Sequence, residues 1–310
     1  MLWEEYQMIK AGGPTFVPLK PRFSLTADIL AFRRCPRQYG FFGVRGFVPA
    51  HTVQLFYGTI IHEVLDRTHR HYGGLENPGT KGKIPTDSDI EGYFKEVEDA
   101  LIARGIRSIN KSLHDQAIEV LRRFNRLEGP ILYPRVIDTE CKVQGDRPSH
   151  IVEGVIDVLI SPPSTSSDPS EVEIWDYKGS KRPKKQYDLD TYRYQMLVYS
   201  ALYRMKYGVL PKKAVLYFMN ELDRDDLKST PKDAIWEIGL TSAEIDMALK
   251  EFDRTAREII ACNESQVWEP PPSDHIPEDT CTACDIRWSC SSFTKARGRV
   301  PMKLEVKKPK

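Results

Sequence analysis

Two carboxylates and one lysine on two short apolar segments are the residues best suited to chemistry in this chain of 310 residues. Asp157 interrupts the apolar run 151–160, and Asp176 and Lys178 end a second short run, 174–178. Two carboxylates held together repel, so a site that keeps both ionised usually holds a divalent cation. Such a cation activates water and offsets the charge of a phosphate, while a nearby ammonium group orients the water or stabilises developing negative charge. The set therefore indicates metal-assisted hydrolysis of a phosphodiester, and the alternative is two strand-end acids with a surface lysine.

Strands are the elements expected to hold these groups. The segment 161–170 consists of turn-forming residues and separates two runs rich in β-branched side chains. This pattern is typical of two antiparallel strands, which we expect over 150–160 and 171–178, after a third strand over 135–143. The pairing would bring the two carboxylates and the lysine to one end of a sheet.

Further charged residues lie close to these strands in the sequence. Glu140 and Glu153 are candidates for an additional acidic group in the site. The segment 178–185 contains five basic residues and no acid. Besides Lys178, these are Lys181, Arg182, Lys184 and Lys185. Such a patch would bind phosphates through charge alone, and that binding would weaken with salt; the alternative is a solvated loop.

Apolar residues at helical spacing predict helices before, between and after the strands. Ser24 or Thr26 is expected to cap the first helix, which Cys35-Pro36 ends. We interpret the two middle helices as a scaffold with solvated charges. The expected helices are 24–34, a helix that includes 58–66, then 88–108, 113–127, 188–207 and 242–261, with further strands over 211–219 and 234–238.

One histidine of the predicted helix around 58–66 is a candidate ligand. His62 follows Gly58 in a Gly-x-x-x-His sequence. By itself such a histidine is more often packed or exposed than a ligand, although neutral imidazole is a good ligand for manganese. His69 and His71 are expected to be surface residues.

Three cysteines near the C-terminus have the spacing of metal ligands. Cys281, Cys284 and Cys290 form a Cys-x2-Cys-x5-Cys pattern. Thiolates at this spacing bind zinc or an iron–sulfur cluster, and the spacing does not decide between them. The candidates for a fourth ligand are Cys35, Cys141 and Cys262.

Composition narrows the classes of protein that fit this chain. No apolar stretch is long enough to span a membrane, and the first residues lack the basic and apolar regions of a signal peptide. Six cysteines without an export signal indicate reduced thiols or metal ligands rather than a disulfide framework. We therefore expect a cytoplasmic or nucleoid-associated protein. The net charge of +1 leaves any nucleic-acid binding to local patches.

Taken together, the chemistry-bearing residues resemble one family of enzymes. Asp157 followed by Asp176-Tyr-Lys178 looks like the active-site signature of PD-(D/E)XK nucleases. Further matches, in the expected order, are similar to the RecB-like branch with an iron–sulfur cluster, which includes the AddB nuclease domain and CRISPR-adaptation nucleases. These matches are Cys35 before a proline, Gly-x-x-x-His62, Gln195-x-x-x-Tyr199 and the C-terminal cysteine triplet.

The resemblance implies the fold and the domain organisation. It implies an α/β fold with a restriction-endonuclease-like αβββαβ core, in which helices flank a mixed central sheet. The implied parts are an N-terminal arm (1–21), a nuclease domain (22–293) with a helical insertion (73–135) and an iron–sulfur segment (262–293) that closes onto Cys35, and a basic tail (294–310).

The resemblance also implies roles for the matched residues. The ligands of Mg²⁺ or Mn²⁺ would be His62, Asp157, Asp176 and the carbonyl group of Tyr177. Lys178 would aid the attacking water. Gln195 and Tyr199 share a helical face at i and i+4, and would position the nucleic acid or a catalytic side chain. The cysteine pattern of the branch selects Cys35 as the fourth ligand and implies a [4Fe–4S] cluster, with structural Zn²⁺ as the alternative.

The expected activity is that of a metal-dependent DNA nuclease. By resemblance, it would act as an exonuclease on single-stranded DNA or DNA ends, leave 5′-phosphates, and serve repair, recombination or defence. No Walker motif is present, so a helicase partner would be a separate chain. One alternative is a catalytically weak DNA-binding subunit of a helicase–nuclease or CRISPR-adaptation complex, and another is a zinc-stabilised protein without a nucleic-acid role.

Overall fold

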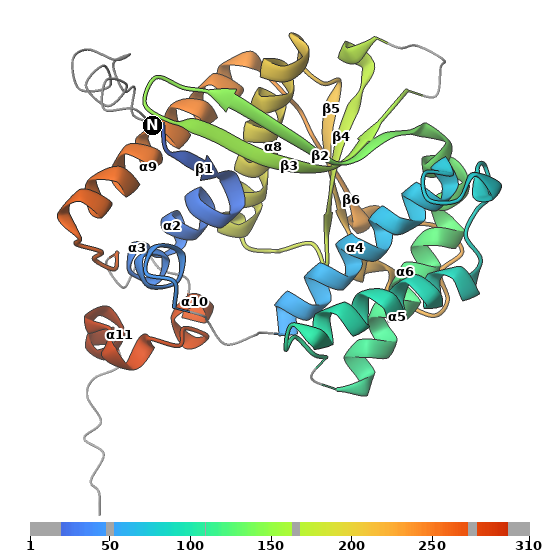
Figure 1. The fold of residues 1–310 in the computed structure, drawn as a ribbon, viewed down its shortest axis with the longest axis horizontal. Coiled ribbons are helices and arrows are strands. Elements are labelled where there is room, and N and C mark those ends of the chain that lie inside the picture. The colour runs from blue at the N-terminus through green and yellow to red at the C-terminus, as the bar shows by residue number, and fades with distance from the viewer. Residues whose placement is uncertain (1–19, 48–52, 109, 163–167, 272–277, 297–310) are drawn as a thin grey trace, which may run out of the picture.

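A mixed β-sheet forms the centre of the molecule, and helices cover both of its faces (Figure 1). The structure is a computed structural model that describes residues 20–47, 53–108, 110–162, 168–271 and 278–296. The sheet has six strands. They are β1 (Arg22–Ser24), β2 (Val136–Asp146), β3 (Ile151–Ile160), β4 (Glu173–Lys178), β5 (Lys213–Phe218) and β6 (Ile235–Ile238).

The connections of the sheet follow the predicted order. The strands lie in the order β1-β3-β4-β5-β6, and β2 pairs with β3. β3 is antiparallel to both β2 and β4, whereas β4 and β5 are parallel, as strands joined by a helix usually are. The prediction of an α/β fold with an αβββαβ core is therefore confirmed. Strand β1 was not predicted, because three residues are too short to show an alternating pattern.

Helices from the two halves of the chain cover opposite faces of the sheet. One face packs against α4 (Val53–Gly73), α5 (Asp87–Ala103), α6 (Lys111–Leu127) and α7 (Gly129–Leu132), and the other against α8 (Gln186–Tyr207) and α9 (Ser242–Ser265). The shorter helical segments are η1 (Leu25–Leu30), α2 (Ala31–Arg34), α3 (Pro36–Tyr39), η2 (Gly40–Val44), α10 (Glu278–Thr282) and α11 (Ser291–Ala296). None of the helices within the described ranges is long and apolar enough to cross a membrane.

Local capping interactions fix several helix ends. The Ser24 hydroxyl accepts a hydrogen bond from the N–H group of Ala27, as predicted for the first helix. Helix α5 ends at Ala103 rather than at the predicted 108, because Gly105 adopts a φ of +79° and reverses the chain.

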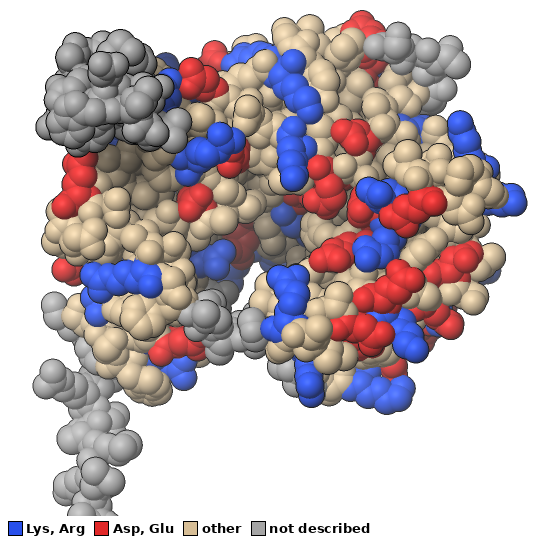
Figure 2. All heavy atoms as spheres, viewed as in Figure 1, with Lys and Arg blue, Asp and Glu red and all other residues tan. Residues whose placement is uncertain are grey.

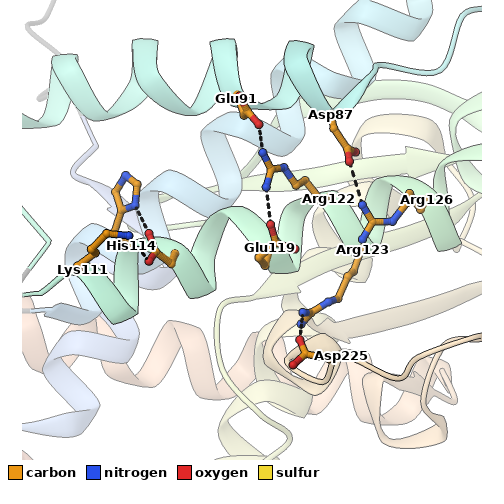
Figure 3. Close-up of polar contacts among 10 residues, drawn as sticks. Asp87, Glu91, Lys111, His114, Glu119, Arg122, Arg123, Arg126 and Asp225 are labelled. Carbon is orange, nitrogen blue, oxygen red and sulfur yellow. Dashed lines mark hydrogen bonds and ion pairs between the residues drawn. The ribbon is translucent and has the colours of Figure 1, made fainter.

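The arginines of α6 are neutralised by acids of neighbouring elements (Figure 3). Arg122 forms ion pairs with Glu91 and Glu119. Arg123 Nη2 lies 2.5 Å from the carboxylate of Asp225, in the loop after β5. These pairs tie α6 to α5 and to that loop, so the middle helices are a scaffold rather than a free basic surface.

Alternation along β4 divides its side chains between two apolar cores. Trp175 and Tyr177 belong to the core under α4, α5 and α6. Ile174 belongs to the core under α8 and α9. Because successive side chains point to opposite faces of a strand, Asp176 points toward α8.

Candidate active site

Asp157 and Asp176 meet where two strands of the sheet diverge. β3 and β4 pair over three positions, from Val158 with Trp175 to Ile160 with Glu173. Past the pair of Val158 and Trp175, toward Asp157 and Asp176, β3 remains paired with β2 and β4 remains paired with β5. The two carboxylates follow directly at this fork. The predicted position at one end of the sheet is therefore wrong for Asp157, which lies inside a long strand that continues past its partner.

The backbone is bent at the fork. Val152 and Ile156 pack in the core under α8, whereas Val158 and Ile160 pack in the core under α4. Strict alternation would place all four on one face, so β3 reverses its faces around Asp157.

Strand β2 shows a matching irregularity at Glu140. Its neighbours Thr139 and Cys141 pair with Val158 and Ile156, so Glu140 lies beside Asp157 in the register. Glu140 has a φ of 48°, a left-handed conformation that residues other than glycine rarely adopt and that costs about 1 kcal/mol or more. The bend directs the Glu140 carboxylate into the site.

Three side chains converge here in a geometry that suits a divalent cation. His62, Glu140 and Asp157 offer ligand atoms that all lie within 4.8 Å of one another. With α4 they line a cleft of about 590 Å³. Figure 2 shows the molecule hollowed beside α4, between the part that carries α4 and α5 and the part that carries α3 and α10. Two carboxylates and an imidazole fit Mg²⁺ or Mn²⁺, with Mn²⁺ the better match for the nitrogen ligand.

The charges of this group are strongly coupled. Burial alone would lower the pKa of His62, but the charge and hydrogen bond of Asp157 outweigh burial and raise it to about 9. His62 Nδ1 lies 3.1 Å from Asp157 Oδ2. Burial and the charge of Asp157 raise the pKa of Glu140 to about 7. At neutral pH the histidine therefore carries a proton that a cation would have to displace.

Asp176, Lys178 and Gln195 form a second, adjoining network. Lys178 Nζ lies 2.6 Å from Asp176 Oδ2 and donates to Gln195 Oε1 at 2.9 Å. Gln195 Nε2 donates to Asp176 Oδ1 at 2.8 Å and lies 3.2 Å from the hydroxyl oxygen of Tyr199. Burial raises the pKa of Asp176 to about 6, against the opposing charge of Lys178. The i, i+4 pair on α8 thus faces the site, as the sequence predicts.

Tyr177 joins the two networks through its backbone and is anchored by its side chain. Its N–H group donates to Asp157 Oδ2 at 2.7 Å. Its hydroxyl lies 3.0 Å from His69 Nε2 in the opposite core. This backbone contact places Tyr177 beside the group formed by His62, Glu140 and Asp157, which we call the cation group.

The prediction that His69 and His71 are surface residues is wrong. They are 4% and 8% exposed, and His71 Nδ1 lies 2.7 Å from the hydroxyl of Tyr93 on α5. His71 is thus covered by α5, whereas His69 packs against Tyr133 and Tyr177, and spacing within α4 reveals neither contact. Burial also lowers the pKa of His69, so its imidazole stays neutral.

The second candidate acid, Glu153, belongs elsewhere. It forms an ion pair with Arg22 of β1, and it is not in the group formed by His62, Glu140 and Asp157. β1 pairs with β3 at this position, which holds the Glu153 carboxylate away from the fork.

The basic loop directly follows β4. Among the described residues, none of the four side chains of Lys181, Arg182, Lys184 and Lys185 forms an ion pair. The Arg182 guanidinium lies 5.2 Å from the centre of the Trp236 ring, and its backbone N–H donates to Glu221. The loop therefore presents positive charge next to the site, and no acid of the described residues forms an ion pair with these four side chains.

Four cysteines from opposite ends of the chain line one pocket. Cys35 contributes from the N-terminal side, and burial raises the pKa of its thiol, with Cys284 and Cys290 adding to the rise. Cys141 lies elsewhere, with its sulfur 3.8 Å from the Tyr207 hydroxyl, and Cys262 packs against the core under α9. Of the three candidates for a fourth ligand, the fold brings Cys35 to the triplet.

The thiols of this pocket are less tightly grouped than the side chains of His62, Glu140 and Asp157. Among the described residues, no three of these thiols have sulfurs that all lie within 4.8 Å of one another. The four cysteines are Cys35, Cys281, Cys284 and Cys290. Both zinc and an iron–sulfur cluster take four cysteine thiolates, so this lining fits either kind of centre.

Comparison with known proteins identifies relatives of the whole fold. A sequence model described as the PD-(D/E)XK nuclease superfamily matches residues 23–291. The crystal structure of a "Putative exonuclease" from Eubacterium rectale has 16% identity and a TM-score of 0.51, and the match covers 100% of this chain and 96% of that one. The structure of SSO0001 has 15% identity and a TM-score of 0.36 over 94% of this chain and 98% of its own, which is too low to support an argument. No curated protein matches the sequence significantly.

Proposed function

The chain belongs to the PD-(D/E)XK nuclease superfamily, which implies a phosphodiester hydrolase, and we propose that it is a Mg²⁺- or Mn²⁺-dependent DNA nuclease of the RecB-like branch. We propose further that it acts as an exonuclease on single-stranded DNA or on DNA ends. The observation that carries the proposal is the fork between β3 and β4. There Asp157 and Asp176 adjoin Lys178 and the cation group of His62 and Glu140.

Each residue has a distinct part in the proposed reaction. His62, Glu140 and Asp157 would hold the cation, and Asp176 and the Tyr177 carbonyl would be further ligands. The bound cation supplies Lewis acidity toward water and phosphate. Lys178 orients the attacking water or stabilises the negative charge that develops on the phosphate. The cleaved phosphate then stays on the 5′ end of the product.

The other networks hold these groups in place. Gln195 links Asp176 and Lys178 by hydrogen bonds to both, so it fixes their separation. Tyr199 supports Gln195. The basic loop binds the phosphates on one side of the scissile bond. Its residues are Lys181, Arg182, Lys184 and Lys185.

A cleavage assay with labelled ends tests the proposal. Protein purified without oxygen is incubated with end-labelled single- and double-stranded DNA, with and without Mg²⁺ or Mn²⁺. We expect cleavage only with the cation, and faster cleavage of single strands. Binding without cleavage under all these conditions would favour a DNA-binding subunit of a helicase–nuclease or CRISPR-adaptation complex.

Metal affinity should increase with pH. Because the pKa of His62 is raised to about 9, the imidazole must lose a proton when it binds a cation. Glu140, with a pKa of about 7, releases a second proton below that pH. We therefore expect Mn²⁺ affinity to rise by up to about tenfold per pH unit between about pH 7 and pH 9, to rise more steeply below about pH 7 where two protons are released, and to level off above about pH 9.

Calorimetric titration with Mn²⁺ in two buffers of different protonation enthalpy measures this release directly. His62→Gln should abolish the proton release above about pH 7. An affinity that does not change with pH would contradict the assignment of His62 as a ligand.

Gln195 should matter more than its partner Tyr199. Gln195→Ala removes hydrogen bonds to two buried charged groups, each worth about 1.5–3 kcal/mol. We expect a lower melting temperature and turnover reduced by roughly tenfold or more. Tyr199→Phe removes one weaker contact and is the matched control. Equal effects in single-turnover cleavage would contradict a positioning role specific to Gln195.

We also propose that the cysteine pocket holds a [4Fe–4S] cluster. The pocket brings together four cysteines, the number of thiolates that a [4Fe–4S] cluster takes, and structural Zn²⁺ is the alternative. The pocket joins Cys35 to the segment 281–290, so the cluster would tie the N-terminal part of the domain to its C-terminal part.

A further inference from the structure

An aromatic surface flanked by arginines lies beside the cysteine pocket and outside the metal site. Its first half is the turn after α3, where Phe41 and Phe47 pack with ring centres 5.6 Å apart. Phe47 is 57% exposed. A large apolar side chain that is rigidly held and exposed next to charge usually marks a binding site.

The backbone under these rings is firmly anchored. The N–H group of Phe47 donates to the Phe41 carbonyl at 3.1 Å, and that of Arg45 donates to the Gly40 carbonyl at 3.0 Å. Gly46, with a φ of +69°, allows the reversal between them. Gly40 packs so closely on Trp268 that an added Cβ atom would overlap the indole ring. The turn is thus fixed to the core, with the Phe47 ring exposed and the Phe41 ring partly exposed.

Arginines surround the Phe41 ring. The guanidinium carbons of Arg37 and Arg45 lie 5.5 Å and 5.4 Å from its centre. The segment 31–47 contains four arginines and no acidic residue. Arg33 pairs with Glu251. Arg37 and Arg45, which flank the ring, form no ion pair within the described residues, so the surface combines flat apolar faces with positive charge.

The second half comes from the C-terminal cysteine segment. Trp288 is 72% exposed, with the Arg287 guanidinium 5.0 Å from its ring and Phe293 packed edge-on behind it at 5.6 Å. Arg37 Nη2 donates to the Ser289 carbonyl at 3.3 Å, which joins the two halves. Figure 1 shows α3 next to α10 and α11, although they lie at opposite ends of the sequence.

We propose that this aromatic surface binds a single strand of nucleic acid by stacking its bases on Phe41, Phe47 and Trp288. Aromatic side chains stack on any exposed base, and adjacent arginines bind the backbone phosphates. Paired bases in a duplex cannot offer their faces in this way, so the surface selects unpaired strands. The inference rests on the proposed nuclease function and specifies its substrate as a strand with unpaired bases.

The aromatic surface lies close enough to the metal cleft for a strand bound there to reach it. Phe47 precedes Leu55, which lines that cleft, by 55 − 47 = 8 residues. Eight residues span at most roughly 28 Å, even fully extended. A strand stacked on the aromatic surface is therefore only a few nucleotides away from the cation group.

Binding of labelled oligonucleotides tests the inference in the full chain with its cluster, in a Lys178→Met background that prevents cleavage. Phe47→Ala and Trp288→Ala should each weaken binding of oligothymidylate by roughly 5- to 100-fold. Phe47→Tyr should retain binding, since it keeps the ring. Leu75 is an exposed apolar residue that is not part of the aromatic surface, so Leu75→Ala should have no effect on this binding. Arg45→Ala should lower the slope of log affinity against log salt concentration by about one, the change expected for the loss of one phosphate contact.

An abasic strand and a blunt duplex provide the decisive comparison. Both keep the phosphates. The abasic strand offers no base faces, and the duplex offers only those of its terminal pairs, so binding of the abasic strand should be insensitive to Phe47→Ala and Trp288→Ala and binding of the duplex nearly so. The inference is overturned if these variants bind oligothymidylate as tightly as the parent, or if they weaken the abasic strand equally.

Failure of the nuclease proposal gives a different signature. Wild-type protein with Mn²⁺ should hydrolyse thymidine 5′-p-nitrophenyl phosphate, a small diester that needs no stacking surface. If wild-type protein does not hydrolyse this diester but binds oligothymidylate through the aromatic residues, the nuclease proposal alone is refuted. If it hydrolyses the diester but its binding does not depend on the aromatic residues, the stacking inference alone is refuted.

Discussion

Replacement of Lys178 by methionine should reduce DNA cleavage by roughly 10²- to 10³-fold or more, the usual effect of removing a charge that stabilises a transition state. Methionine retains much of the volume of the buried lysine stem. The substitution removes the ammonium group 2.6 Å from Asp176. It also removes a positive charge that competes with the cation, so Mn²⁺ binding should persist or become tighter.

Two measurements separate this effect from misfolding. Cleavage is measured under single-turnover conditions, and Mn²⁺ binding by calorimetry on the same sample. Lys181→Ala, in the exposed loop three positions later, is the control and should change DNA affinity and its salt dependence but not turnover. Wild-type turnover in Lys178→Met would refute the assigned role.

Combining substitutions should reveal that the site acts as a unit. Asp157→Asn removes both a cation ligand and the partner of His62. Because residues of one catalytic unit have non-additive effects, Asp157→Asn with Lys178→Met should be little slower than the more damaging single variant. Multiplicative losses would indicate that the two groups act independently.

Replacement of Cys35 by serine should remove the visible absorbance of the cluster and lower the melting temperature by roughly 10 °C or more. Metal binding that occurs only in the folded state contributes directly to folding stability, and here the ligands come from both ends of the domain. Without the fourth thiolate, the segment 278–296 keeps the hydrogen bond from Arg37 to Ser289 but loses its covalent tie to Cys35, and should become more sensitive to protease.

Cys262→Ser is the matched control, because Cys262 lies on α9 outside the pocket. It should leave absorbance and melting temperature unchanged. Elemental analysis distinguishes the two kinds of centre: iron with equal sulfide indicates a cluster, and zinc alone indicates the alternative. Wild-type iron content in Cys35→Ser would exclude Cys35 as a ligand.

Most of the fold could be predicted because its signals are local. Alternating or β-branched runs gave β2, β3, β4 and β5 within a few residues of their observed bounds, and apolar spacing indicated α4, α6, α8 and α9. The errors lie where local signals are weak or ambiguous. β1 is too short for a pattern, and Gly105 ends α5 before its apolar spacing does.

The candidate site was only partly visible in the sequence. Motif spacing selected Asp157, Asp176 and Lys178, whose proximity depends on one short hairpin-like pairing. Glu140 was one of two candidate acids, and nothing in its local sequence distinguishes it from Glu153. Its entry into the cation group depends on a φ of 48° opposite the bend in β3.

The sequence by itself determined which residues could carry chemistry in this protein: a pair of carboxylates with a lysine, a histidine on a helix, and a cysteine triplet. These follow from residue types and short spacings, which local backbone geometry preserves. The tertiary structure alone decided which of them meet. It separates β3 from β4 at the fork, buries His69 against Tyr133 and Tyr177, and places Cys35 beside the triplet, because strand register and helix packing depend on contacts between residues far apart in the chain.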